Sequence, residues 1–408
     1  MILIEHSRRN LASKAKVAKK VAAVVKKKAY TSVYGCGLSA SGALAIPRLV
    51  INENAVTAKE AHRPLRISHM NTRGIRHIAA GFGFSLFASK DKLYGSGLNN
   101  SHVRDPESKL QEYYISAKRV QLPIQGSILS ISSGRSHSLV ATSEGVFAFG
   151  DNSFGQCGQD PEHSKEVHGL RDALLRAVEI PSDSPVVAVH CSLDSSFALT
   201  ELGELFAFGL NEDGQCSNGS YGIQWRPSKV LGDAAGEKIV SISGSSDTIT
   251  ALSDKGEIFI WGQCEYGQAL LGADSVQMNL SRYVPFPPGK IASIGSTTSS
   301  CVASTSCGEV YVWGVGLLGL GPALQKVDRP VLMDPPLFGK EKVAKVYAGN
   351  TSAGALTSNG RLYVWGQNRY GLLGLEHGKD QYFPFQIFFP SDVNHASFGP
   401  DHSLFLMR

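Results

Sequence analysis

Acidic, basic and imidazole side chains recur at one kind of position in this sequence, the short turn between two apolar runs. The six residues are Arg135, His137, Asp194, Asp247, Asp401 and His402. A carboxylate or imidazole in such a turn can act as an acid or base, or can contact a charged group of a partner. It can equally serve the fold, because an imidazole can bond a neighbouring turn and Asp often caps its own backbone. The residues alone leave both interpretations open.

A second set of side chains is basic and lies in residues 57–77, outside the repeating pattern described below. One acid accompanies five basic residues there: Lys59, Arg63, Arg66, Arg73 and Arg76. Lys and Arg neutralise phosphates, so this insertion is a candidate loop facing RNA or phosphate, with a solvated surface as the alternative. Residues 163–177 form a second candidate loop, since insertions into repeat proteins extend over one face, where partners dock.

Known catalytic and cofactor-binding motifs are either absent from the sequence or lie outside the structural setting that they require. A GxGxxG match spans residues 314–319, but a dinucleotide site needs that motif to open a helix within a βαβ unit. No GxxxxGK[ST] phosphate loop occurs, and the seven cysteines contain no CxxC pair that would indicate a zinc site. No paired acid and base converge in the pattern. We therefore expect no cofactor, no metal, no small-molecule substrate and no bond-making chemistry.

The elements that must position these side chains repeat along the chain. A short aromatic or β-branched run ends in glycine seven times, at Gly37, Gly97, Gly150, Gly209, Gly262, Gly314 and Gly366. The gaps between these glycines are 60, 53, 59, 53, 52 and 52 residues. A second glycine follows five residues later in six of the seven copies. This spacing is typical of a repeat protein.

Each repeat predicts four short antiparallel strands, the composition of one propeller blade. Apolar and small polar residues alternate in runs such as ILSISSGRSHSLVAT, and a hairpin glycine precedes most aromatic runs. The first aromatic run lacks companion strands before it, and the last companion run lacks an aromatic strand after it. We therefore predict an all-β, seven-bladed propeller over residues 29–408, whose last blade combines residues 393–406 with residues 31–37.

The repeat resembles that of the regulator-of-chromosome-condensation family. That family's G-x-x-H-[ST] turn and N-x-x-G-Q-x-G segment stand here as GRSHSLV (134–140) and GDNSFGQCG (150–158), with further copies at 209–216 and 366–374. The resemblance spans residues 30–408 and implies a guanine-nucleotide exchange factor. Such a factor binds the nucleotide-free GTPase better than the loaded one, so nucleotide leaves more readily. By this resemblance Asp194, Asp401 and His402 would displace the GTPase's phosphate-loop Lys or its Mg²⁺.

Three stretches are most similar to the mitochondrial, Williams–Beuren-region branch of that family: GLSASGALAIP (37–47), VYVWGVGLLGLGP (310–322) and DQYFPFQI (380–387). This similarity implies a protein of the mitochondrial matrix or associated peripherally with the inner membrane. It also implies two roles, nucleotide exchange on the inner-membrane dynamin-like fusion GTPase and association with large-subunit RNA and proteins during mitoribosome assembly. A non-catalytic protein scaffold is a third interpretation.

The sequence also departs from the family pattern in its turns. Where the family has G-D-S-H, this chain has Arg135 beside His137, and a G-N-D-H position keeps Asp194 but loses the histidine. Only residues 399–402 keep both the acid and the histidine. The resemblance therefore does not extend to the nuclear transport GTPase as a partner.

The charge is concentrated at the start of the chain. Residues 1–28 hold nine Lys or Arg and one acid, which leaves 31 basic against 34 acidic residues in the rest. A cationic segment rich in Ala and Val predicts a mitochondrial presequence, with a nuclear or nucleic-acid-binding arm or a solvated tail as alternatives. The near-neutral remainder lacks the basic excess that drives non-specific nucleic-acid binding.

Overall fold

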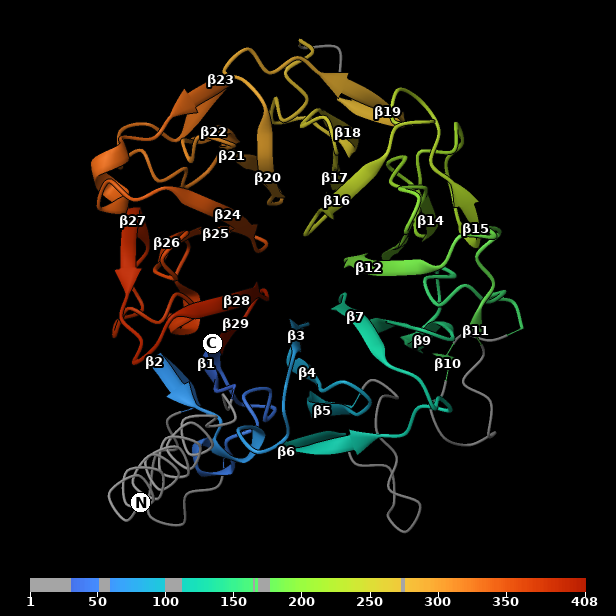
Figure 1. Ribbon diagram of the computed structural model, residues 1–408, viewed down its shortest axis with the longest axis horizontal. Helices are drawn as coiled ribbons and strands as arrows, with labels where there is room; N and C mark the ends of the chain where they lie inside the picture. The colour runs from blue at the N-terminus through green and yellow to red at the C-terminus, as the bar shows by residue number, and fades with distance from the viewer. Residues whose placement is uncertain (1–30, 51–58, 100–111, 164–165, 168–176, 273–275) are drawn as a thin grey trace, which may run out of the picture.

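The computed structural model describes residues 31–50, 59–99, 112–163, 166–167, 177–272 and 276–408. These residues form seven sheets arranged as blades around a central channel (Figure 1). The predicted all-β, seven-bladed propeller is therefore confirmed. The presequence predicted for residues 1–28 and most of the predicted loop 163–177 lie outside the described residues. No helix in the described part of the chain is long and apolar enough to cross a membrane.

Each blade has an inner strand at the channel and a second strand paired to it. The inner strands are β3 (His77–Ala80), β7 (Ile128–Ser133), β12 (Val186–Ser192), β16 (Ile239–Ser243), β20 (Ile291–Ser296), β24 (Val343–Ala348) and β28 (Val393–Phe398). The second strands are β4 (Phe84–Ala88), β8 (His137–Thr142), β13 (Ser195–Thr200), β17 (Thr248–Ser253), β21 (Ser300–Thr305), β25 (Ser352–Thr357) and β29 (His402–Met407).

The third strand of each blade carries the aromatic–glycine run, and the fourth forms the outer edge. The third strands are β5 (Leu93–Leu98), β9 (Gly145–Asp151), β14 (Leu205–Gly209), β18 (Ile258–Gln263), β22 (Val310–Val315), β26 (Leu362–Gly366) and β1 (Val33–Leu38). The outer strands are β6 (Tyr113–Val120), β10 (Glu166–Val167) with β11 (Ala177–Val178), β15 (Gln224–Lys229), β19 (Gln277–Val284), β23 (Lys326–Leu332), β27 (Gln381–Ile387) and β2 (Glu60–Arg66). Blades are numbered 1 to 7 from β3.

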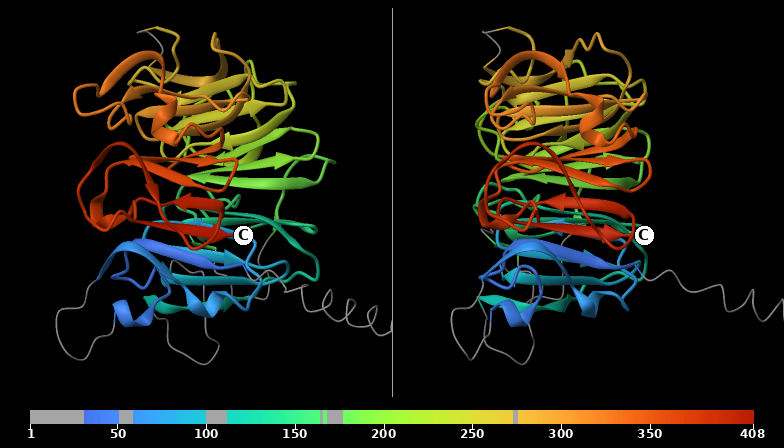
Figure 2. Two further views of the ribbon diagram at one scale, coloured as in Figure 1. Left: turned by 60° about the vertical axis from the view of Figure 1, so that its left-hand side comes forward. Right: turned by 90° about the vertical axis from the view of Figure 1, so that its left-hand side faces the viewer.

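Blade 7 is built from both ends of the described chain. Its strand order is β2-β1-β29-β28, and Tyr34 of β1 lies opposite Phe405 of β29 in antiparallel register. Edge-on views show the end of the chain beside the first strand (Figure 2). The predicted closure is confirmed, and it removes two sheet edges that an open array would expose.

Proline marks the outer strands of four blades. In each of these outer strands the proline lies in a bulge where the pairing register shifts. The bulge is opposite the residue that precedes the glycine of the paired third strand. The prolines are Pro64, Pro227, Pro330 and Pro384. Proline donates no backbone hydrogen bond, so it is tolerated at such edge positions and limits pairing with another chain.

Tryptophan packs neighbouring blades together. Trp261, Trp313 and Trp365 are at most 1% exposed. The indole Nε1 of Trp261 donates to the Gln215 carbonyl at 2.6 Å, and that of Trp313 donates to the Gln268 carbonyl at 2.8 Å. Each bond joins a third strand to the loop of the preceding blade, so the repeated tryptophans are packing residues.

One sequence prediction is wrong. Residues 57–77 were expected to form a loop inserted into the repeat, but Glu60–Arg66 is β2, the outer strand of blade 7, and Ser68–Met70 is a short 3-10 turn, η2. Three similar 3-10 turns lie elsewhere: η1 (Pro47–Leu49), η3 (Pro335–Phe338) and η4 (Arg369–Gly371). The bulge around Pro64 interrupts the alternation of apolar and polar residues that would have revealed β2.

Candidate partner-binding face and central channel

The propeller has two faces that differ in the turns they carry. All inner strands have the same place in their blades, so their first residues lie at one mouth of the channel and their last residues at the other. We call these the strand-start face and the strand-end face. The strand-end face carries the turns between first and second strands, at residues 81–83, 134–136, 193–194, 244–247, 297–299, 349–351 and 399–401. Arg135, Asp194, Asp247 and Asp401 all lie in these turns.

Arg135 of blade 2 and Asp194 of blade 3 form an ion pair across the boundary between their blades. The Arg135 guanidinium contacts both carboxylate oxygens, with Nε 3.3 Å from Oδ1, and the Arg135 backbone N–H donates to the Leu193 carbonyl at 2.9 Å. The Asp194 side chain is 1% exposed, whereas 48% of the Arg135 side chain is exposed. Burial raises the pKa of Asp194, the Arg135 guanidinium opposes that rise, and Asp151 and Asp247 add to it.

Asp247 lies next along the same face, in blade 4, and with Arg135 and Asp194 it forms an arc of charged residues. Gln215 Nε2 donates to its Oδ1 at 2.8 Å, and Ser246 Oγ donates to Oδ2 at 3.2 Å. Asp151 of blade 2, which the sequence analysis did not select, accepts a bond from Gln156 Nε2 at 3.1 Å. The structure therefore brings Arg135, Asp194 and Asp247 into one arc on the strand-end face.

Asp401 and His402 lie apart from that arc, in blade 7. Asp401 Oδ1 is 2.6 Å from His402 Nδ1, and His402 Nε2 is 2.7 Å from Ser85 Oγ of blade 1. His402 has no exposed surface, and the Asp401 side chain is 19% exposed. Asp401 is thus the member of this pair that a partner could reach.

His137 makes the same kind of bond between blades 2 and 3. Its Nε2 lies 2.9 Å from Ser196 Oγ, and the residue is fully buried. Burial is the main cause that lowers the pKa of His137 to about 3, so the imidazole is neutral near pH 7. The geometry assigns both imidazoles to blade packing, one of the two interpretations above. Their role as partner contacts stays a prediction.

The five basic candidates separate into two groups. Lys59, Arg63 and Arg66 flank or lie on β2 at the outer rim of blade 7. Arg73 and Arg76 precede β3 and line a hollow with Lys90, Lys92 and Tyr94 beside the strand-start face. The Arg73 guanidinium lies 4.5 Å from the centre of the Tyr94 ring. A single continuous basic loop is therefore not present.

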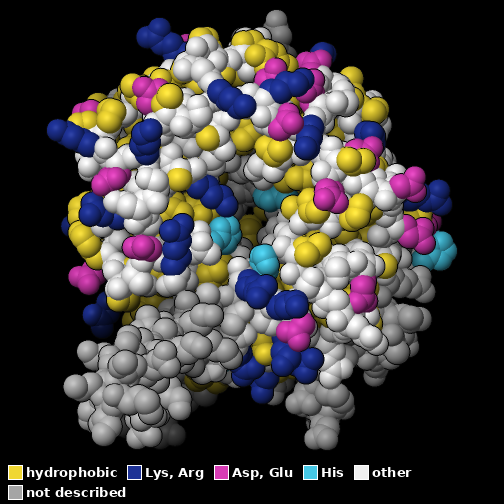
Figure 3. Space-filling view, viewed as in Figure 1, with side chains coloured by type: hydrophobic (Ala, Val, Ile, Leu, Met, Phe, Trp, Pro, Cys, Tyr) yellow, Lys and Arg dark blue, Asp and Glu magenta, His cyan; other side chains and the backbone are white. Residues whose placement is uncertain are grey.

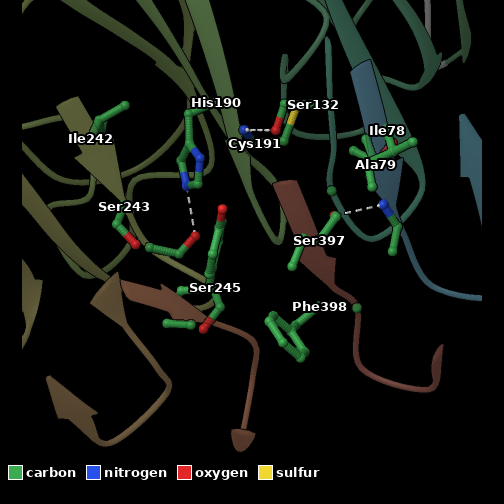
Figure 4. Close-up of a pocket in the computed structure, with 18 of the residues that line it drawn as sticks. Ile78, Ala79, Ser132, His190, Cys191, Ile242, Ser243, Ser245, Ser397 and Phe398 are labelled. Atoms are coloured by element: carbon green, nitrogen blue, oxygen red, sulfur yellow. Dashed lines mark hydrogen bonds between the residues drawn. The ribbon is translucent and has the colours of Figure 1, made fainter. Parts of the chain in front are cut away.

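Serines are the most numerous polar residues in the wall of the central channel. Its cavity of about 350 Å³ is lined by all seven inner strands. Serine side chains accept backbone N–H bonds from the next blade, as at Cys191 N to Ser132 Oγ (2.9 Å) and Ala80 N to Ser397 Oγ (3.0 Å) (Figure 4). His190 donates across the boundary to the Gly244 carbonyl at 2.7 Å (Figure 4).

Sequence reasoning missed the charged side of this channel. Lysine, arginine and histidine side chains gather around the central hollow (Figure 3). Burial is the main cause that lowers the pKa of His395 to about 3, and the neighbouring Lys345 and His77 contribute to that lowering. Lys345, His395 and His77 occupy the third position of their repeat copies, where ILSISSG has Ser130. Aligning the copies by position would have found them.

In the part of the chain that the structure describes, no group of three or more His, Cys, Asp or Glu residues could hold a metal ion. Six of the seven cysteines are buried. Burial raises the pKa of the Cys191 thiol to about 12, so it is a poor nucleophile near pH 7.

Comparison with known proteins gives matches along most of the chain. The profile "Regulator of chromosome condensation (RCC1) repeat" matches residues 143–199 and 359–406, and a second profile of that description matches 128–156 and 343–372. The mouse RCC1-like G exchanging factor-like protein is 35% identical over 92% of this chain and 87% of its own length.

Solved structures agree. The crystal structure of human WBSCR16 is similar with a TM-score of 0.85 and 33% identity, covering 93% of this chain and 99% of that one. A structure of Prp20p from Saccharomyces cerevisiae, described with its binding properties to Gsp1p and histones, has a TM-score of 0.73. It covers 92% of this chain and 91% of that chain at 17% identity, which supports the fold alone.

Proposed function

The chain belongs to the regulator of chromosome condensation (RCC1) repeat family and its RCC1-like exchange factors, and from that premise we propose that it is a guanine-nucleotide exchange factor that docks a GTPase on the strand-end face. The observation that carries this proposal is the arc formed by Arg135, Asp194 and Asp247, since it places the exposed Arg135 guanidinium and the partly exposed Asp247 on one face, with Asp194 buried between them. Prp20p, which is described as binding Gsp1p, has the same fold.

The proposed mechanism is differential binding. A basic group of the GTPase that normally holds the nucleotide phosphates would pair with Asp247 or Asp401, whose carboxylates lie at the surface of the turns. That pairing is available only when the nucleotide site is empty, so docking favours the empty state and nucleotide leaves faster. No covalent bond is made or broken in this scheme, so the protein acts without enzymatic chemistry of its own.

We further propose that the protein is mitochondrial, in the matrix or peripherally on the inner membrane, and that its partner is the inner-membrane dynamin-like fusion GTPase. This finer proposal is supported by the cationic composition of residues 1–28 and by the resemblance at residues 37–47, 310–322 and 380–387.

Release of a fluorescent guanine nucleotide from that GTPase tests the exchange activity. The propeller at micromolar concentration should accelerate release at least about tenfold, and Asp247→Asn should remove most of that effect. Asp254→Asn is the matched control, because Asp254 lies in the same blade but in the exposed β17–β18 turn on the strand-start face. No acceleration by the parent protein, or equal loss in both variants, would refute the proposal.

A second candidate function, binding of mitoribosomal large-subunit RNA, is favoured by the basic hollow beside β3. Four cations surround this hollow with Asp91 as its acid, and the Arg73 guanidinium lies over the ring of the buried Tyr94. Neutralisation of phosphates by such cations is a main source of RNA affinity.

Crosslinking in mitochondria tests that candidate. Arg73→Glu with Arg76→Glu should reduce recovered large-subunit RNA severalfold, whereas Arg63→Glu with Arg66→Glu on the outer rim should have a smaller effect. Recovery of no ribosomal RNA by the parent protein would reject RNA binding without affecting the exchange proposal.

A further inference from the structure

Neighbouring blades meet in layers that we call seams, numbered by their two blades. Two seams are filled by histidine, since His137 reaches Ser196 in seam 2/3 and His402 reaches Ser85 in seam 7/1. Seam 4/5 is filled by a glutamine of the repeat. Gln268 Nε2 donates to Thr248 Oγ1 at 3.2 Å and to the Thr298 carbonyl at 3.3 Å, and its Oε1 accepts from the Tyr266 N–H at 2.8 Å.

Seam 5/6 contains neither residue. Ser300 pairs with Gly314 in the register in which His137 pairs with Gly150, so Ser300 takes the histidine position. Leu320 follows Gly319 as Gln268 follows Gly267, so leucine takes the glutamine position. A pocket of about 280 Å³ lies in this seam, and Leu320 does not line it. Seam 6/7 has the same two residue types, Ser352 and Leu372, so it is the observed pocket that distinguishes seam 5/6.

The floor of this pocket carries a donor without an acceptor. Trp365 lines the pocket and is 1% exposed. Unlike Trp261 and Trp313, its indole Nε1–H makes no hydrogen bond to any described residue. Gly319 lies close to this atom, since a Cβ there would be 3.0 Å from Trp365 Nε1. An indole N–H that opens into a pocket can donate to a ligand that offers an acceptor.

The other polar groups of the pocket suit the hydrogen bonds of a primary amide ligand. Ser300 and Ser352 contribute hydroxyls near the floor, and Asp380 and Gln367 line the same pocket. No Lys or Arg lines it. A carbonyl oxygen can take the Trp365 proton while an NH₂ group donates to hydroxyl or carboxylate oxygen. A carboxylate ligand would instead face Asp380 without a cation to balance the two charges.

We propose that seam 5/6 is a binding site for a primary carboxamide, the group that the propeller's own glutamine supplies in seam 4/5. Because the pocket lies beside the turns at residues 297–299 and 349–351, it faces the strand-end side. A glutamine or asparagine side chain of a docked protein can supply the carboxamide, and so can a small free amide. The inference stands on packing and hydrogen bonding alone and does not depend on exchange activity.

Indole N–H resonances of the labelled full chain test the proposal. The protein has four tryptophans, so Trp365→Phe identifies the signal of Trp365. The probe is N-acetylglutamine methylamide, and the acid control is N-acetylglutamate methylamide. We expect a saturable shift of the Trp365 signal with the glutamine probe and a much smaller shift with the acid.

A variant that refills the seam gives the decisive control. Leu320→Gln should abolish the shift, because its own carboxamide would occupy the pocket, and Ser300→His is a second way to fill it. Nicotinamide distinguishes the sources: a shift with nicotinamide but not with the peptide analogue supports a small-molecule ligand, and the reverse supports a protein side chain. No saturable shift with either probe, or an undiminished shift in Leu320→Gln and Ser300→His, would overturn the proposal.

Discussion

Seams 2/3 and 5/6 occupy the same place in the repeat, yet one is closed and the other is open. Seam 2/3 holds His137 bonded to Ser196 and the Arg135–Asp194 ion pair at its surface. Seam 5/6 has Ser300 and Leu320 at the filling positions and keeps a pocket of about 280 Å³. The difference teaches that the strands and glycines of the repeat suffice to build the ring, whether a seam is filled by a histidine or keeps a pocket.

The largest expected effect is at the closed seam. His137→Ala should lower the free energy of unfolding by about 2–4 kcal/mol, because it removes a fully buried ring and its hydrogen bond. Ser300→Ala, at the same register position of the open seam, should cost less than about 1 kcal/mol. Urea unfolding of both variants measures the contrast, and equal losses would mean that the two seams do not differ in packing.

A smaller effect follows from pH. The pKa of His137 is about 3 in the folded protein, below the ordinary value of 6.5, so the unfolded chain binds the proton first as pH falls. This residue alone should cost about 2 kcal/mol of stability between pH 7 and pH 5. His137→Gln should flatten the pH profile by that amount. A parallel profile for His137→Gln would contradict the neutral, buried imidazole.

The ion pair at the surface of the closed seam should matter less, because half of the Arg135 side chain is in solvent. Arg135→Ala should cost about 1–2 kcal/mol at pH 7, since the buried Asp194 carboxylate loses its counter-charge. Burial raises the pKa of Asp194, so its protonated form is favoured in the folded state as pH falls, and the loss should shrink towards pH 4. Melting curves at several pH values measure this trend. If the stability lost in Arg135→Ala did not change with pH, the loss would come from packing of the arginine side chain and not from its charge.

The smallest effect on stability is expected when the residue at the glutamine position of a seam is replaced. Leu320→Gln should change stability by less than about 1 kcal/mol, because the open seam already has room and partners for an amide. Gln268→Leu in seam 4/5 should be more damaging, since the Tyr266 N–H and Thr298 carbonyl would lose their partner. If Leu320→Gln proved the worse of the two, the comparison between filled and vacant seams would be wrong.

The blades and their closure could be predicted from the sequence because their signals are local. The spaced glycines adopt positive φ, as at Gly150 (φ 111°), and a Cβ there would lie 2.3 Å from the Ser136 carbonyl oxygen. Strand β2 escaped prediction because Pro64 and the bulge around it break the alternation. Its basic side chains were therefore assigned to an insertion.

The site could be predicted only in part. The turns that hold Asp194 and Asp247 were identified, but their neighbours come from other blades. The Arg135–Asp194 pair joins turns 59 residues apart, and spacing along the chain does not specify such a contact. Lys345 and His395 were missed because, as single residues in strands, they resemble ordinary solvent-facing positions. The open pocket was missed because it lies between two blades, and spacing along the chain does not specify how side chains from different blades fill that space.

The joint blade has a consequence for how the molecule is made. Val33 pairs with Leu406, so strand β1 is synthesised long before the strand that it pairs with. Contacts this distant in sequence slow folding, because the intervening chain must be ordered before they form. During that interval strand β1 has an unoccupied edge, which is a hazard for pairing with another nascent chain. Biogenesis of this protein should therefore be most sensitive to chaperone supply in the interval between emergence of the sixth blade and emergence of β29.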